Sequence, residues 1–202
     1  MTNPPDGTAR PTPDGPRAPG RLSTDPNIGP VRISAEQLAE RVAQLGAEIT
    51  ERYEGRPPLL VGVLRGASMF LTDLARAIDL PLAIDFIAVS SYGSATQTSG
   101  VVRVVKDLDE DLSGRHVILI EDIVDTGLTL RYLRRNLAAR KPASLEVCAL
   151  LARKSADVVA QDVGFVGFEI DDDEFVIGYG LDVDQRYRNL GYIAGYVVPD
   201  RP

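Results

Sequence analysis

The sequence has very few side chains that form cross-links or bind transition metals. Among its 202 residues there is one cysteine, Cys148, and one histidine, His116. A single thiol excludes an internal disulfide and a cysteine-rich metal site. Cys148 lies in an apolar run at 145–151 and is expected in the core. His116 precedes another apolar run, so we expect it at the surface or at a strand end.

Positive charge is also scarce, because 22 lysines and arginines stand against 29 acidic residues, for a formal net charge of −7. Sequence-independent binding of nucleic acid relies on clustered cations, so this balance argues against it. A cation such as Mg²⁺ is the more natural partner. Hydrophobic residues make up 44% and charged residues 25% of the chain. This composition is typical of a soluble globular protein, and nothing in it indicates a membrane.

The first twenty residues lack the apolar stretch of a signal peptide, and nine of them are proline or glycine. Such a composition does not build a packed core. We therefore expect residues 1–27 to form a disordered tail and residues 28–202 to form one domain. The missing export signal and the single thiol together predict a cytoplasmic location.

Two common nucleotide-binding motifs are missing as well. The loop at 125–129 lacks the lysine and the second glycine of G-x-x-x-x-G-K-[ST]. The segment GYGLDV from Gly178 has Val183 where the dinucleotide fingerprint requires glycine or alanine. These absences exclude a P-loop and a GxGxxG site.

The most informative segment that is present is HVILIEDIVDTGLTL, at residues 116–130. Its apolar run at 117–120 predicts a strand covered on both faces of a mainly parallel sheet. Ligands bind at the carboxyl ends of such strands. Glu121 and Asp122 follow the run directly, and strand alternation would point them to opposite faces. We expect neither of these two acids to be buried in the core.

The same segment continues into a loop suited to an anion. Asp125, Thr126, Gly127 and Thr129 precede an apolar helical face that begins at Leu130. Gly127 permits a tight turn, and the free amides at a helix start attract a phosphate. A simple helix cap is the alternative. Three acids, two threonines and a glycine within nine residues favour a site that holds a cation and a phosphate together.

Strand-like and helix-like segments alternate along the chain. A capping-box pattern from Ser34 to Gln37 opens a helix whose apolar face reaches Ile49. The expected strands are 59–64, 82–90, 101–108, 117–120, 145–151, 165–170 and 175–180. This order indicates an α/β fold with a parallel sheet. The closing segments predict a hood or an antiparallel extension, and the polar connector 91–100 predicts a mobile flap.

Four segments resemble, in order, the bacterial-type hypoxanthine-guanine phosphoribosyltransferase family, over about residues 33–192. They are LRGA at 64–67, SYG at 91–93, IEDIVDTGLT at 120–129, and DEFVIGYGLD at 173–182 with QRYRNL after it. The resemblance implies a type I phosphoribosyltransferase fold, with a parallel sheet, flanking helices and a small hood. It also implies transfer of the phosphoribosyl group from phosphoribosyl pyrophosphate to N9 of hypoxanthine or guanine, which gives IMP or GMP.

The resemblance assigns the acidic segment to the phosphoribosyl group. Asp125 would be the catalytic residue, acting as general base or acid at N7 of the purine. Glu121 and Asp122 would lie against the ribose hydroxyls beside Mg²⁺, and the 5′-phosphate would lie on the loop at 125–129. The nucleotide-binding residues implied in this way are Glu121, Asp122, Ile123, Val124, Asp125, Thr126, Gly127, Leu128 and Thr129.

Other residues gain roles from the same resemblance. Pyrophosphate would be bound by Leu64, Arg65, Gly66 and Arg188, often across a cis peptide at Leu64-Arg65. The flap would include Ser91, Tyr92 and Gly93. The residues implied at the purine are Arg153, Lys154, Phe175, Val176 and Asp182. Asp182 would also hold a second Mg²⁺.

One position departs from the family pattern. Counting back from FVGF at 165–168 places Arg153 where the family usually has a lysine that donates to the purine 6-oxo group. Lys154 follows immediately, and a local shift would restore the usual residue. Arginine and lysine are not equivalent at a directional contact. Both residues stay candidates.

Three alternative functions remain open. The first is a relative that prefers xanthine or another 6-oxopurine. The second is a nucleotide-sensing, RNA-binding regulator on the same fold, against which the net charge of −7 and the intact acidic loop argue. The third is a receiver-type signalling domain, which has no use for the segment 173–182. Members of the resembling family form dimers or tetramers, so a homodimer or homotetramer is expected.

Overall fold

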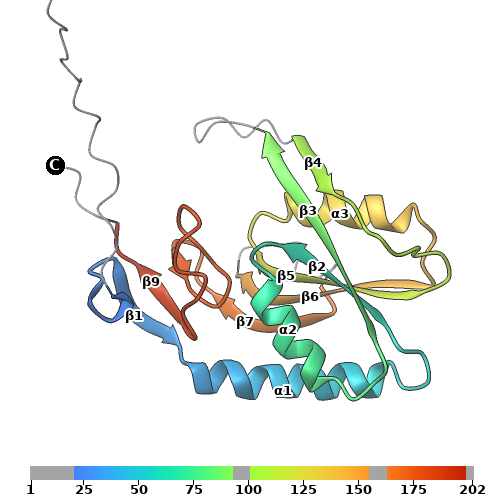
Figure 1. Cartoon of the computed structure of the whole chain (residues 1–202), viewed down its shortest axis with the longest axis horizontal. Coiled ribbons are helices and arrows are strands. Elements are labelled where there is room, and N and C mark those ends of the chain that lie inside the picture. Colours follow the sequence, from blue (N-terminus) through green and yellow to red (C-terminus); the bar gives the residue numbers. More distant parts are fainter. Residues whose placement is uncertain (1–20, 93–100, 155–162, 199–202) are drawn as a thin grey trace, which may run out of the picture.

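A six-stranded, mainly parallel sheet forms the centre of the protein (Figure 1). The computed structural model describes residues 21–92, 101–154 and 163–198. In sheet order the strands are β4 (Val101–Lys106), β3 (Ala83–Tyr92), β2 (Leu59–Leu64), β5 (His116–Val124), β6 (Ser144–Arg153) and β7 (Phe165–Ile170). All neighbours pair in parallel except β3 and β4, which are antiparallel. The predicted α/β class is confirmed.

Helices cover both faces of this sheet. α1 (Ala35–Arg52) and α2 (Ser68–Ala77) lie on one face, and α3 (Leu128–Ala138) lies on the other (Figure 1). The predicted capping box at the start of α1 is confirmed, since the Gln37 amide donates to the Ser34 hydroxyl and the Ser34 amide donates to the Gln37 side chain. No helix in the described residues is both long and apolar enough to cross a membrane.

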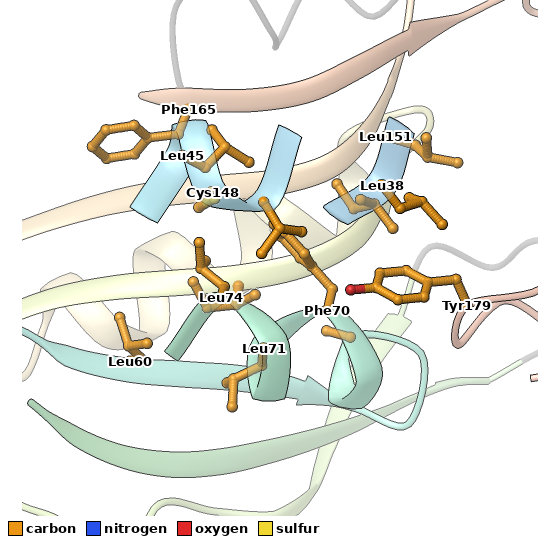
Figure 2. Packing of buried hydrophobic residues seen from close by; sticks show 14 of the residues in the cluster. Leu38, Leu45, Leu60, Phe70, Leu71, Leu74, Cys148, Leu151, Phe165 and Tyr179 are labelled. Atoms are coloured by element: carbon orange, nitrogen blue, oxygen red, sulfur yellow. The ribbon is translucent and has the colours of Figure 1, made fainter. Parts of the chain in front are cut away.

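Strand alternation divides the core into two clusters. On β2, Leu60 packs with the residues of α1 and α2, whereas Leu59 packs with those of α3. On the first face, Leu38 and Leu45 of α1 meet Phe70 and Leu74 of α2 beside Cys148 of β6 (Figure 2). The prediction that Cys148 is a core residue is confirmed, and burial raises the pKa of its thiol well above the usual value.

The predicted hood is a separate three-stranded antiparallel sheet, not an extension of the main one. Its strands, in sheet order, are β1 (Ile28–Ile33), β9 (Ile193–Tyr196) and β8 (Val176–Ile177). This sheet packs next to the main one, beside the start of α1 (Figure 1). It therefore brings the segment after β7 close to the central strands.

The predicted tail does not extend to residue 27. Residues 22–24 form a 3-10 helix, and Asp25 accepts a hydrogen bond from the Tyr187 hydroxyl at 3.1 Å. Asn27 donates to the Tyr196 hydroxyl at 3.2 Å. These contacts to distant aromatic residues order 21–27, which composition alone did not reveal. Residues 1–20 lie outside the described part of the chain, as do 93–100 of the predicted flap.

A buried carboxylate anchors the connection between β4 and β5. Asp85, which is 6% exposed, accepts hydrogen bonds from the backbone amides of Phe86, Asp109 and Glu110 at 2.6–2.9 Å. Burial alone would raise its pKa. The three amides and the nearby charge of Lys106 outweigh burial, and the pKa is lowered.

Replacement of Asp85 with alanine is expected to destabilise the protein by about 2–4 kcal/mol, because three part-buried hydrogen bonds from backbone amides lose their acceptor. A lowered carboxylate pKa stabilises the fold above the unfolded-state pKa, and this contribution disappears as pH falls through the folded-state value. Urea unfolding between pH 3 and pH 7 checks this. Asp109→Ala, an 86% exposed partner of Lys106, should change stability by less than about 0.5 kcal/mol. Equal stability of the two variants would contradict the prediction.

Candidate active site

The two adjacent acids of β5 lie on opposite sides of the sheet. The strand extends through both of them to Val124, farther than predicted. Glu121 borders a small cavity at the start of α3, whereas Asp122 borders a larger cavity toward the hood. The predicted alternation holds. The expectation that neither acid is buried is wrong for Glu121, which is only 5% exposed, because the start of α3 covers this end of the strand.

Burial dominates the electrostatics of this pair. Burial raises the pKa of Glu121 well above the usual range, and the neighbouring charge of Asp122 raises it further. Burial also raises the pKa of Asp122, and backbone amides together with the charge of Arg188 offset only part of that effect. An adjacent cation would favour the ionised form of both carboxylates.

The loop at 125–129 has the geometry expected of an anion site. Gly127 has a φ of +72°, in the left-handed region, and directly precedes α3. Gly127 at the N-cap position forms no side-chain capping hydrogen bond in the described residues, so the first amides of the helix can bind an anion. A cavity of about 80 Å³ lies here, lined by Glu121 and by residues 123–130. Thr126, Leu128 and Thr129 are exposed on this loop.

Arg153 connects the loop to the hood side of the site. Its Nε forms an ion pair with Asp125 Oδ1 at 2.8 Å. Its Nη1 donates to the carbonyl of Asp171 at 2.8 Å and to that of Glu174 at 3.1 Å. The Arg153 side chain is only 14% exposed. Lys154 instead forms an exposed ion pair with Asp171 at 2.6 Å. Of the two candidates, the structure brings only Arg153 together with Asp125.

A cavity of about 250 Å³ separates β5 from the hood. It is lined by Asp122, Ile123, Asp125, Arg153, Phe175, Val176, Leu181 and Asp182. Phe175 is 55% exposed where it lines this cavity, and its ring centroid lies 5.8 Å from that of Tyr196. Val176 is buried in β8. Apart from Lys154, the predicted purine-binding residues therefore lie around one cavity.

The predicted pyrophosphate loop packs tightly against this site. The peptide between Leu64 and Arg65 is cis, as the resemblance implied. Gly66 lies so close to Asp122 that an added Cβ would fall 1.5 Å from the carboxylate oxygen. Gly180 in turn packs on the Gly66 carbonyl, where a Cβ would fall 2.0 Å away. The sequence brings together three distant segments here because two of them have glycine at the contact.

Arg188 reaches the same region from the loop after Gly180. Its Nη2 lies 2.7 Å from Asp182 Oδ1, and its Nη1 donates to the Gly180 carbonyl at 2.6 Å. Arg65 Nη1 donates to the side chain of Gln185 at 2.9 Å. Gln185 and Leu181 were not predicted as site residues, because an isolated glutamine or leucine in the sequence does not indicate a binding role.

The resemblance implied one Mg²⁺ beside Glu121 and Asp122 and a second at Asp182, and the structure distributes these three acids over two cavities. In the described residues, no group of three or more acidic, histidine or cysteine side chains gathers as a metal site. Asp122 and Asp182 line the same cavity, and Glu121 lies on the other face. Two hard oxygen ligands fit an Mg²⁺ ion whose remaining ligands come from substrate and water. Of the predicted flap residues, Ser91 and Tyr92 end β3, and Gly93 lies outside the described residues.

Three features define the class of this protein. They are a parallel sheet whose strand β5 leads into the loop at 125–129, a hood, and a cavity between β5 and the hood. Residues 33–184 match the family described as "Phosphoribosyl transferase domain". The chain belongs to this phosphoribosyltransferase family.

Within the family, similar proteins include hypoxanthine-guanine and hypoxanthine phosphoribosyltransferases. That of Mycobacterium avium is 53% identical over 174 residues, which cover 83% of this chain and 85% of the relative. The hypoxanthine phosphoribosyltransferase of Haemophilus influenzae is 48% identical over 173 residues, covering 84% and 96%. The crystal structure of a hypoxanthine-guanine phosphoribosyltransferase from Bacillus anthracis, with HEPES in its active site, has a TM-score of 0.79 and 42% identity, and covers 84% of this chain and 99% of that one.

Proposed function

We propose that the protein transfers the 5-phosphoribosyl group from phosphoribosyl pyrophosphate to N9 of hypoxanthine or guanine, giving IMP or GMP and pyrophosphate. The observation that carries this proposal is the cavity in which Asp125, Arg153 and Phe175 lie beside the anion loop. A planar base and a phosphorylated ribose would thus occupy neighbouring places. The names of the similar proteins support the same substrates.

Three residues are proposed to hold the base. Phe175 offers an exposed ring on which a purine can stack. Arg153 donates to the 6-oxo group, in place of the lysine usual in the family, while its Nε stays on Asp125. Val176 meets the purine edge through its backbone. A 6-amino group offers no acceptor lone pair to a guanidinium, so adenine would be rejected.

Proton transfer is assigned to Asp125. The carboxylate lies at the cavity wall, and Arg153 orients it through the 2.8 Å ion pair. As the bond from N9 to C1 of the ribose forms and the bond from C1 to pyrophosphate breaks, Asp125 takes the proton from N7. The positive charge that develops on the ribose would be stabilised by two carboxylates, Asp122 from the cavity that holds the base and Glu121 from the cavity at the loop.

The phosphate groups are proposed to bind at the two ends of the site. The amides and hydroxyls at 125–129 hold the 5′-phosphate, and Leu64, Arg65, Gly66 and Arg188 hold pyrophosphate. Asp122 and Asp182 would hold Mg²⁺, which offsets the charge of the departing pyrophosphate. Assembly into a homodimer or homotetramer and a cytoplasmic location stay predictions.

A panel of bases tests this function. The protein is mixed with Mg²⁺, phosphoribosyl pyrophosphate and, separately, hypoxanthine, guanine, xanthine, adenine or uracil, and both nucleotide and pyrophosphate are measured. Turnover is expected with hypoxanthine and guanine, no turnover with adenine or uracil, and loss of turnover in EDTA. Faster turnover with xanthine would favour the xanthine-preferring alternative. No turnover with any 6-oxopurine would refute the proposal.

A further inference from the structure

Gln185 lies between the two arginines assigned to pyrophosphate. Its Oε1 accepts a hydrogen bond from Arg65 Nη1 at 2.9 Å and another from Arg188 Nη2 at 3.2 Å. Arg65 directly follows β2 of the main sheet, whereas Arg188 lies in the segment between the hood strands β8 and β9. A single acceptor atom therefore sets the separation of two guanidinium groups that belong to different parts of the fold.

The backbone around Gln185 is held in an unusual conformation. Gln185 has a φ of +64°. Asp184 directly before it and Tyr187 two residues after it have φ values of +49° and +74°. Non-glycine residues enter this left-handed region at a cost and stay there only where surrounding contacts fix them. Here the backbone amide of Gln185 donates to Asp182 Oδ2 at 2.7 Å, and Val183 and Arg186 form an antiparallel bridge across the turn. The turn thus aims the Gln185 side chain at the arginines.

The side chain of Gln185 also has a suitable charge. Two guanidinium groups that share an acceptor repel each other, and an amide oxygen between them reduces that repulsion. Because the side-chain amide is neutral, it adds no negative charge beyond that of Asp182, whose Oδ1 already lies 2.7 Å from Arg188 Nη2. A carboxylate at this position would neutralise part of the arginines' positive charge and repel an incoming phosphate.

We propose that Gln185 is a positioning residue for pyrophosphate: it holds Arg65 and Arg188 at the separation that a diphosphate needs and adds no negative charge beside them. This inference rests on the pyrophosphate role given above to the two arginines. Their side chains are ordered before the ligand arrives, so less conformational entropy is lost on binding. Gln185 does not touch the base cavity, whose lining does not include it.

Replacement of Gln185 with alanine tests the proposal. In the full-length protein with Mg²⁺, calorimetric titration with pyrophosphate should give a Kd about tenfold higher than in the wild type, since both arginines lose their common acceptor. The KM for phosphoribosyl pyrophosphate should rise by a similar factor. The KM for the purine base should stay within about twofold.

Gln185→Glu separates charge from shape. It keeps the size and both acceptor contacts but adds a negative charge, so pyrophosphate should bind still more weakly than to the alanine variant at low salt. The difference between the two variants should shrink as ionic strength rises. Asn189→Ala, an exposed site in the same loop, is the matched control and should bind pyrophosphate as the wild type does.

Two results would overturn the inference: a wild-type pyrophosphate Kd in Gln185→Ala, or a loss of base and pyrophosphate affinity by the same factor, which would mean general damage to the site. Calorimetry with pyrophosphate needs no turnover. If no base were a substrate and Gln185→Ala still lost pyrophosphate affinity, the positioning role would stand while the proposed function failed.

Discussion

Asp125→Asn is expected to lower kcat by on the order of 10²- to 10³-fold, the usual loss when a positioned proton-transfer group is removed. Asparagine fills the same volume but cannot take the proton from N7. It also loses the charge that pairs with Arg153 at 2.8 Å. Steady-state rates of IMP formation with hypoxanthine, measured beside the wild type, check this prediction.

The affinity for phosphoribosyl pyrophosphate should change little in this variant, by about threefold at most. The 5′-phosphate is assigned to backbone amides and hydroxyls of the loop, which the substitution leaves in place. Stability should also be retained, because the Asp125 side chain is 61% exposed. The matched control is Asp111→Asn, an exposed aspartate in the turn before β5. A wild-type kcat in Asp125→Asn would remove Asp125 from the proton-transfer role.

The strands of the main sheet could be predicted because their apolar runs are local. Leu59–Leu64 has the predicted bounds, and the capping box at Ser34 fixes the start of α1. The hood strand β1 was not predicted, since IGPVRI contains proline and arginine and alternates poorly. Its pairing with β9, with Ile28 opposite Tyr196, joins the two ends of the domain. Such long-range pairing leaves no periodic signal in either segment.

In the candidate site, too, the features that depend on adjacent residues were predicted, and those that depend on tertiary contacts were not. The acids and the loop at 121–129 were predicted because strand, turn and helix start are adjacent in the sequence. The choice between Arg153 and Lys154 needed tertiary contacts, since both follow the same strand. Arg153 points to Asp125, whereas Lys154 points to Asp171 at the surface. The burial of Glu121 was missed because the covering residues come from the start of α3, and local charge gave no indication of them.

Glu121→Gln is expected to raise stability and lower activity together. The raised pKa of Glu121 means that the folded state binds its proton more tightly than the unfolded state, whose value is near 4.5. Stability then falls as pH rises above that value, up to the pKa of the folded state. Glutamine carries no charge at any pH and is free of this penalty. The free energy of unfolding at pH 8 should therefore increase by about 1 kcal/mol or more.

Activity should fall by about 100-fold in the same variant, since the ribose and its developing positive charge lose a carboxylate. The measurements are urea unfolding at pH 4 and pH 8, and kcat at pH 8 with Mg²⁺. The two proteins should differ in stability at pH 8 and converge at pH 4, where Glu121 is protonated in the folded state. Glu48→Gln, in an exposed ion pair with Arg41, is the control and should change stability by less than about 1 kcal/mol. A Glu121→Gln protein that is less stable than the wild type at pH 8 would contradict the prediction, because it would show that the buried carboxylate stabilises the fold.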